Sequence, residues 1–156
     1  MTRDELLVEL RKPLPKLPAY LFYDARGGEL FEQITGLPEY YQTRTEIALL
    51  DAAAPRILDA LKPARLAELG SGSAAKIGAF LSRMTPSTCQ LLDVNDDALD
   101  SSIARLAGEF PGWNYQSVIG SFVGGADALG PGGGPRLTLF FGGTIGNFHP
   151  SEVPDF

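Results

Sequence analysis

The sequence predicts an α/β protein built on a parallel sheet, and two observations support this fold class. Four short apolar segments are typical of strands, at residues 65–69, 89–94, 114–119 and 136–141. The two connections among the first three segments carry apolar side chains at helical spacing: Ile77, Phe80, Leu81 and Met84 in one, and Leu99, Ile103, Leu106 and Phe110 in the other. Strands that alternate with helices indicate a parallel sheet with right-handed crossovers.

Three helices are expected ahead of this sheet. A short one spans residues 4–10, and the proline-rich segment 12–18 should follow it as an extended arm that lies across another part of the molecule. A second helix is expected over residues 28–35, after a turn at Gly27 and Gly28. The third begins at Thr43.

The helix that begins at Thr43 has a local start signal, because Thr43 and Glu46 have the spacing of a capping box. Pro55 lies inside the continuing apolar pattern and should kink the helix or restart it. We therefore divide the chain into an N-terminal arm and helical segment, residues 1–62, and a sheet domain, residues 63–156.

The connection before the fourth strand differs from the others. It has six glycines between Gly124 and Gly134. Such a composition is typical of a flexible segment, so we expect a mobile loop around at most one helical turn.

Composition excludes several classes of function. The net charge is −6, with 13 basic and 19 acidic residues, which argues against a nucleic-acid partner. No apolar run approaches the length of a membrane span and the N-terminus is unlike a secretory signal, so we expect a cytoplasmic protein without membrane contact. Cys89 lies in an apolar segment and is interpreted as a small buried side chain. The single histidine, His149, has no Cys or second His with which to share a metal ion, so no His-based metal site is expected; a carboxylate-only site stays open, but no metal ligand is assigned.

The turn after the first strand, E-L-G-S-G-S-A-A-K at residues 68–76, is the first candidate for a ligand site. Ligands of parallel α/β sheets bind beyond the carboxyl ends of the strands, and glycines at Gly70 and Gly72 would let a ligand approach the backbone closely. Ala74 stands where a dinucleotide fingerprint has its third glycine. Taken alone, two glycines after a strand also fit a simple tight turn.

Three further turns at the same edge supply other candidates. Asp93 ends the second strand about 20 residues beyond Gly72, near the distance at which an acidic residue reaches ribose hydroxyls, although an N-cap cluster is the alternative. Phe122, after the third strand, offers an apolar plate for a purine. Asn147, after the fourth strand, lies among glycines, with helix capping as the alternative role.

A glycine loop and a ribose acid fit either a nicotinamide enzyme or an S-adenosylmethionine (SAM) enzyme. The absence of a third glycine favours SAM, because no pyrophosphate then has to be seated on the helix N-terminus. The sequence also lacks a plausible Tyr-x-x-x-Lys pair for a nicotinamide reductase.

Three long motifs resemble one family. They cover residues 21–46, which include L-F-Y-D and P-E-Y-Y, residues 67–76, and F-F-G-G-T-I-G-N-F-H-P-S-E at residues 140–152. These motifs are similar to those of the histidine-specific SAM-dependent methyltransferases, the histidine Nα-methyltransferases of ergothioneine biosynthesis. The resemblance implies a Rossmann-like class I SAM methyltransferase fold, here with an incomplete parallel sheet. It also implies transfer of methyl groups from SAM to the α-amino nitrogen of histidine, ending at hercynine.

The resemblance assigns roles to individual residues. The residues that would bind the cofactor are Gly70, Gly72, Lys76, Asp93, Ser121 and Phe122. Tyr40 would contact the substrate imidazole, while Tyr23 and Asn147 would act as catalytic residues that line the amino and carboxylate end of the substrate. Simple packing is the alternative for the tyrosines. Ser121 stands where the family usually has an acidic residue, so it can accept a hydrogen bond from the adenine amine only without the assistance of a charge.

The substrate expected from the resemblance is a small amino acid. The alternatives are a methyltransferase of the same family that acts on a tryptophan derivative, or a non-catalytic nucleotide-binding α/β module. Members of the family are about twice as long, so we interpret this chain as an N-terminal half. In the family's sheet the fourth strand is internal, and an unpaired outer edge should leave the chain alone unstable or inactive. The oligomeric state is left open.

Overall fold

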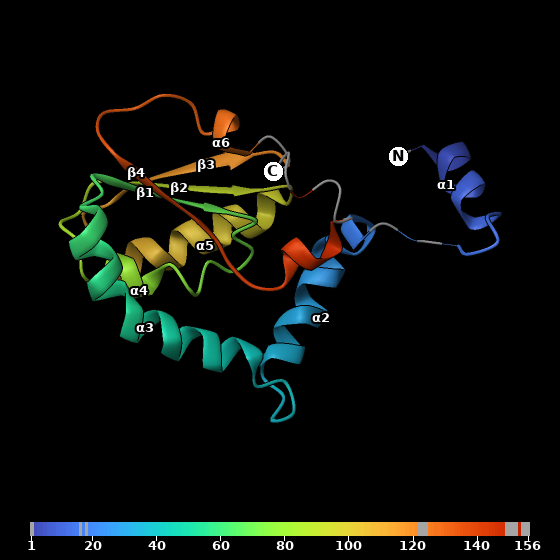
Figure 1. Cartoon of the computed structure of the whole chain (residues 1–156), viewed down its shortest axis with the longest axis horizontal. Coiled ribbons are helices and arrows are strands. Elements are labelled where there is room, and N and C mark those ends of the chain that lie inside the picture. The colour runs from blue at the N-terminus through green and yellow to red at the C-terminus, as the bar shows by residue number, and fades with distance from the viewer. Residues whose placement is uncertain (1, 16, 18, 122–124, 149–152, 154–156) are drawn as a thin grey trace.

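The computed structural model describes residues 2–15, 17, 19–121, 125–148 and 153. Figure 1 labels the α-helices and the strands; η1 and η2 are short 3-10 helices. In chain order the elements are α1 (Arg3–Leu10), η1 (Ala19–Phe22), α2 (Ala25–Thr35), α3 (Gln42–Leu61), β1 (Arg65–Leu69), α4 (Gly78–Leu81), β2 (Thr88–Asp93), α5 (Asp96–Glu109), β3 (Asn114–Ile119), α6 (Gly125–Ala128), β4 (Arg136–Phe140) and η2 (Thr144–Asn147).

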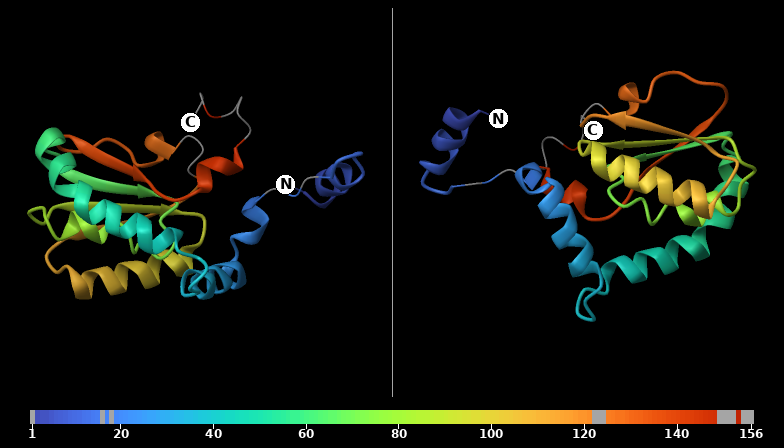
Figure 2. Two further views of the ribbon diagram at one scale, coloured as in Figure 1. Left: turned by 60° about the horizontal axis from the view of Figure 1, so that its bottom comes forward. Right: turned by 180° about the vertical axis from the view of Figure 1, so that it is seen from behind.

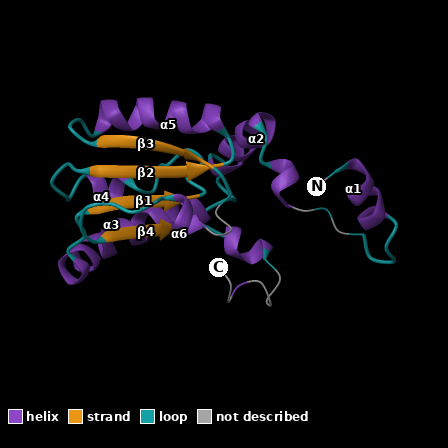
Figure 3. Ribbon diagram, turned by 90° about the horizontal axis from the view of Figure 1, so that it is seen from above, coloured by secondary structure: helices purple, strands orange, loops and turns teal. Residues whose placement is uncertain are grey.

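The strands form one parallel sheet in the order β3-β2-β1-β4. This arrangement confirms the predicted α/β class, and all four strands lie where the apolar segments predicted them. Leu69 at the end of β1 pairs in register with Leu92 on one side and Phe140 on the other, so the carboxyl ends of the strands share one edge. Figure 3 shows this edge facing the region of α2 and η2.

Helices cover the two faces of the sheet unequally. On one face, α3, α4 and α5 pack over a core that contains Leu66, Leu91 and the fully buried Cys89, as predicted for that cysteine. On the other face, α6 and its loop lie over a smaller cluster in which Leu129 packs against Ala67. Strand residues alternate between faces, so Glu68 points to the same side as Leu66.

The predicted capping box at the start of α3 is wrong. The helix begins at Gln42 and its N-cap, Tyr41, makes no side-chain cap bond. Glu46 instead directs its carboxylate away from the helix start, to Lys76 and the Gly142 amide. A tertiary ion pair has therefore taken the side chain that the local pattern assigned to capping.

Pro55 lies inside α3 without breaking the helix into two. The helix is continuous from Gln42 to Leu61, so it does not restart, and Figure 1 shows it bending toward the sheet in its second half. The predicted helix that included Met84 is shorter than expected, since α4 ends at Leu81. The single turn of α6 agrees with the prediction for the glycine-rich connection.

The N-terminal elements depart from prediction in two ways. Helix α2 begins earlier than residue 28 because Asp24 caps it, accepting a bond from the Gly27 amide at 2.7 Å. Gly27 is needed inside the helix, since an added Cβ would lie 1.8 Å from the Phe22 carbonyl oxygen. The proline-rich arm was predicted to lie across another part of the molecule. This prediction is wrong at Leu14, whose side chain is 85% exposed.

The views of Figure 2 agree that α1 lies apart from the sheet. None of the residues of α1 is buried, whereas α3 buries Ala54 in the core. Across the described residues no helix combines the length and the apolar character needed to cross a membrane.

Candidate functional site

The loop after β1, residues 70–76, has an unusual backbone and is called here the glycine loop. Gly70 and Gly72 have φ values of 63° and 48°, in the left-handed region that glycine adopts without steric cost. Ala74 also has a φ of 48°, and its methyl group is buried. The position predicted as a missing third glycine therefore has a glycine-like conformation, and its side chain packs into the core.

Backbone and side-chain bonds hold the glycine loop against the end of β2. The amides of Gly70 and Ser71 both donate to the Leu92 carbonyl, at 2.8 and 3.1 Å. The Gly72 amide donates to Asp93 Oδ2 at 2.8 Å. The structure therefore brings together two of the predicted cofactor residues, Gly72 and Asp93.

Asp93 has a second contact, on the side of α5. Its Oδ1 accepts a bond from the Asn95 amide at 3.1 Å, and Asn95 rather than Asp93 is the N-cap of that helix. Asp93 thus joins the glycine loop to the start of α5. Both carboxylate oxygens already accept backbone bonds, and a carboxylate retains lone pairs for further donors such as ribose hydroxyls. The ribose role stays a prediction.

Two side chains of helix α5 also hold the glycine loop by hydrogen bonds. Ser102 Oγ donates to the Gly72 carbonyl at 2.8 Å, and Arg105 Nη2 donates to the Ser73 carbonyl at 2.7 Å. Sequence reasoning missed both residues. The available signal was Ser102 itself, a polar side chain placed between the apolar positions Leu99 and Leu106 of the helix.

Glu68, next to the glycine loop, is a buried carboxyl that sequence reasoning also missed as a site residue. It is 3% exposed, and among the described residues its Oε2 has no hydrogen-bond partner. Burial raises the pKa of Glu68 to about 8, and the nearby Lys76 opposes that rise. The side chain is therefore mainly protonated at neutral pH. Its signal in the sequence was a carboxyl near the end of an otherwise apolar strand.

Lys76 lies just ahead of α4 rather than on it, and it meets two other parts of the chain. Its Nζ lies 2.7 Å from Glu46 Oε2 on α3, while Glu46 Oε1 accepts a bond from the Gly142 amide at 2.8 Å. We call residues 141–147, which follow β4, the β4 turn. One carboxylate therefore connects α3, the glycine loop and the β4 turn.

The β4 turn carries one of the predicted catalytic residues, and the structure brings it to the other. Asn147 Nδ2 donates to Tyr23 Oη at 2.8 Å, across a separation of 124 residues. The two predicted catalytic side chains are thus neighbours, on the approach to α2 and at the end of η2. Their roles in substrate binding stay predictions.

Tyr40 lies elsewhere, in the turn between α2 and α3. Its ring contacts Phe31 edge to face, with the centroids 6.0 Å apart. This turn and the Tyr23–Asn147 pair lie toward opposite ends of α2 (Figure 1). The contact with Phe31 is the packing role that we weighed as the alternative, and the predicted contact with an imidazole is untested.

The third turn is only partly described. Ser121 is exposed directly after β3, and the preceding Gly120 amide donates to the Asp93 carbonyl at 2.9 Å, which places this turn beside Asp93. Phe122 and His149 lie outside the described residues.

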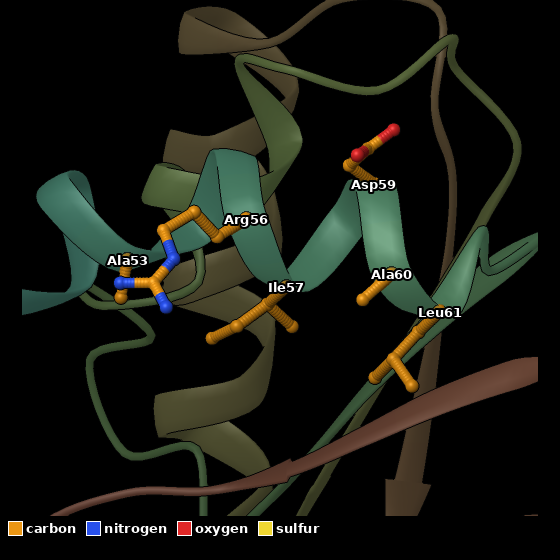
Figure 4. A pocket seen from close by; sticks show the side chains of 6 residues that line it. All are labelled: Ala53, Arg56, Ile57, Asp59, Ala60 and Leu61. Carbon is orange, nitrogen blue, oxygen red and sulfur yellow. The ribbon is translucent and has the colours of Figure 1, made fainter.

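A hollow of about 660 Å³ lies away from these turns, along α3. Figure 4 shows the side chains that line it: Ala53, Arg56, Ile57, Asp59, Ala60 and Leu61. None of the predicted site residues lines it. The chemistry-bearing side chains gather instead at the carboxyl edge of the sheet, so we place the candidate site there.

The residues at this edge fit S-adenosylmethionine. The ammonium and the ribose hydroxyls of the ligand need hydrogen-bond acceptors, and its carboxylate needs a cation. The ligand as a whole needs a stretch of backbone that it can approach closely. Two buried oxygens without partners in the described chain, Glu68 Oε2 and Ser71 Oγ, lie at the glycine loop, and Lys76 supplies a cation. A Cβ added at Gly72 would meet no atom within 4 Å, so this part of the backbone is accessible.

The described residues contain no cluster of side chains typical of a metal centre. Among the residues that the structure describes, no group of three or more His, Cys, Asp or Glu side chains could hold a metal ion.

Comparison with known proteins places the chain in a family. The family model for "Histidine-specific methyltransferase, SAM-dependent" matches residues 2–156. The chain is 40% identical to a histidine N-alpha-methyltransferase of Mycolicibacterium smegmatis, over 90% of this chain and 44% of the relative. It is 35% identical to the enzyme of that name in Mycobacterium tuberculosis, over 99% and 49% respectively. A 4-dimethylallyltryptophan N-methyltransferase of Aspergillus fumigatus is 26% identical over 98% of this chain.

The chain spans about half the length of the curated bacterial relatives that it matches. The match of the family model nonetheless covers almost every residue, including the glycine loop and the β4 turn. The chain therefore belongs to the family of histidine-specific, SAM-dependent methyltransferases.

Proposed function

We propose that this chain takes part in SAM-dependent methylation of the α-amino group of histidine, in the direction of hercynine and ergothioneine. The observation that carries the proposal is the convergence of the glycine loop, Asp93 and Lys76 at the same sheet edge as the turn that bears Asn147. The names of the two bacterial relatives support the substrate.

The cofactor would be held by groups from three turns. Gly70 and Gly72 leave the loop backbone accessible, Asp93 offers acceptors for ribose hydroxyls, and Lys76 offers a cation for a carboxylate. Ser121 and Phe122 would bind the adenine. When bound, SAM supplies a methyl group on a sulfonium, which an amine nitrogen attacks in line.

The protein's part in this reaction is to orient the amine. The α-amino group of a peptide has a pKa of about 7.7 to 8, and the carboxylate of a free amino acid raises the pKa of its amine further. The substrate amine is therefore mainly protonated near pH 7 and must lose a proton to solvent before it attacks. Tyr23 and Asn147, already hydrogen-bonded to each other, would hold the amine and carboxylate end of the substrate. Most of the rate enhancement would then come from positioning.

A tryptophan derivative is the second candidate substrate, favoured by the relative from Aspergillus fumigatus. A non-catalytic nucleotide-binding role is the third candidate, since the glycine loop and Asp93 would serve binding of a nucleotide without catalysis as well. The division of the chain at residue 62 and a cytoplasmic location stay predictions.

Binding and turnover separate these candidates. We expect calorimetry to detect binding of SAM and no binding of NADH. Mass spectrometry of a reaction with histidine and SAM should then find mono-, di- and trimethylated histidine. Binding of NADH in place of SAM would contradict the cofactor assignment, and methylation of a prenylated tryptophan but not of histidine would contradict the substrate.

Tyr40→Phe tests the proposed selection of the imidazole. The variant keeps the ring that packs on Phe31 and removes only the hydroxyl. If that hydroxyl binds the imidazole, histidine affinity falls about tenfold while SAM affinity is unchanged, as expected for one lost hydrogen bond. Equal losses for both ligands in calorimetry would count against the assignment.

A further inference from the structure

Glu46 divides its carboxylate between two loops that differ in their proposed ligands. Oε2 contacts Lys76 Nζ at 2.7 Å, in the glycine loop, and Oε1 accepts the Gly142 amide at 2.8 Å, in the β4 turn. The glycine loop would bind the cofactor, and the β4 turn carries Asn147 toward the substrate. A single side chain on α3 therefore bridges the two loops.

The geometry at this junction leaves little freedom. The side chains of Lys76 and Glu46 are only 19% and 31% exposed, so the pair is shielded from bulk water more than a surface ion pair is. Gly142 has a φ of 79°, and an added Cβ would lie 3.1 Å from Lys76 Nζ. The turn therefore passes close to the ammonium, where a Cβ would press against Lys76, and its backbone conformation favours glycine.

An ammonium group has three donors, so Lys76 can bond to Glu46 and still present donors to a second carboxylate. Lysine is otherwise a flexible side chain, and holding it against one partner removes rotamer freedom before a ligand arrives. The bond to Gly142 likewise fixes the first part of the β4 turn, five residues before Asn147.

We propose that Glu46 is a positioning residue, which holds the cofactor cation Lys76 and the substrate-side β4 turn in one fixed arrangement. This inference rests on the proposed function for its ligands, whereas the coupling between the two loops is a property of the chain alone. It assigns Glu46 a role in linking the two binding events.

Two substitutions separate the two oxygens of Glu46. Glu46→Ala removes both contacts. Glu46→Gln retains an oxygen that can accept the Gly142 amide but loses the charge that holds Lys76. Asp51→Ala is the matched control, because Asp51 lies on the same helix and forms an ion pair with Arg83 at 3.1 Å, away from both loops.

Hydrogen–deuterium exchange tests the coupling without any cofactor. We expect Glu46→Ala to speed exchange of the Gly142 amide and the β4 turn about tenfold, since a bond to a charged acceptor is lost. Glu46→Gln should restore most of the protection, and Asp51→Ala should leave the turn unchanged. Equal acceleration in Glu46→Ala and Asp51→Ala would reduce Glu46 to a general stabiliser and overturn the proposal.

Calorimetry tests the link to the cofactor with two matched probes. S-adenosylhomocysteine carries the amino-acid carboxylate, and methylthioadenosine lacks it. Both Glu46→Gln and Lys76→Met should weaken S-adenosylhomocysteine about tenfold and leave methylthioadenosine unchanged. Unchanged or tighter binding of S-adenosylhomocysteine to Glu46→Gln would show that Glu46 does not position Lys76. If the unsubstituted chain binds neither probe, the proposed function fails, and the exchange measurement still decides the coupling.

Discussion

The surroundings of Glu68 determine its charge state. The side chain lies under the glycine loop on the face covered by α3, α4 and α5, where it is almost completely buried. Desolvation raises its pKa to about 8, the neighbouring carboxylates Asp93 and Glu46 add to that rise, and Lys76 opposes it. A protonated Glu68 can donate as well as accept, which suits a site that must bind both an ammonium and hydroxyl groups.

The raised pKa of Glu68 predicts a pH dependence of stability. Between about pH 4.5 and pH 8 the folded chain keeps a proton that the unfolded chain has lost. The free energy of unfolding should therefore fall as pH rises through this window, by up to ~1.4 kcal/mol per pH unit. Glu68→Gln mimics the protonated acid and should remove most of this slope, as measured by urea unfolding across the window.

Glu32→Gln is the control for that experiment, because Glu32 is an exposed carboxyl on α2. It should leave the slope as it is in the unsubstituted chain. A slope that survives in Glu68→Gln would mean that Glu68 ionises normally in the folded protein.

The strands were the most predictable elements. The pattern of side chains reports the packing most directly in β1 and β2, which are short, apolar and almost wholly buried. Strand β4 is less buried, and β3 has only exposed and partly buried residues. Helix ends were less predictable, because they depend on which bonds the polar side chains make. Thr43 and Glu46 satisfied the local rule for a cap, yet the bonds to Lys76 and Gly142 are tertiary contacts that no local pattern records.

The same distinction applies to the candidate site. Gly72 and Asp93 were predictable because parallel strand order brings consecutive turns together. The Tyr23–Asn147 contact joins residues far apart in the chain, and only the family resemblance suggested it. Ser102 and Arg105 were missed because side chains that bond to a loop carbonyl have no fixed spacing from that loop.

Helix α2 offers a direct comparison of a real and an apparent cap. Asp24 bonds to the Gly27 amide at the start of α2, whereas Thr43 makes no cap bond for α3. Asp24→Ala should destabilise the chain by about 1 kcal/mol, and Thr43→Ala should change stability by only a few tenths. Chemical unfolding followed by circular dichroism measures both. A larger loss of stability for Thr43→Ala than for Asp24→Ala would show that Thr43 does cap α3.

Two features of the whole molecule bear on association between chains: the apolar face of α2 and the position of β4 in the sheet. Helix α2 has an amphipathic sequence but buries none of its residues, and Leu30, Phe31 and Ile34 are 40% to 49% exposed. In the described sheet, β4 lies at one end of the strand order, beside β1. Edge strands and exposed apolar faces both favour association between chains.

We therefore expect the chain to self-associate with rising concentration. Ile34→Lys should shift the association midpoint to higher concentration, because it places a charge in the apolar face of α2. Val8→Lys is the matched control, since Val8 is 58% exposed on α1, a helix that buries no residue and lies apart from the sheet. Light scattering across a dilution series measures the association. A chain that stays monomeric across the whole series would contradict the expectation. Equal effects of the two lysine substitutions would show that added charge, and not the α2 face, controls the association.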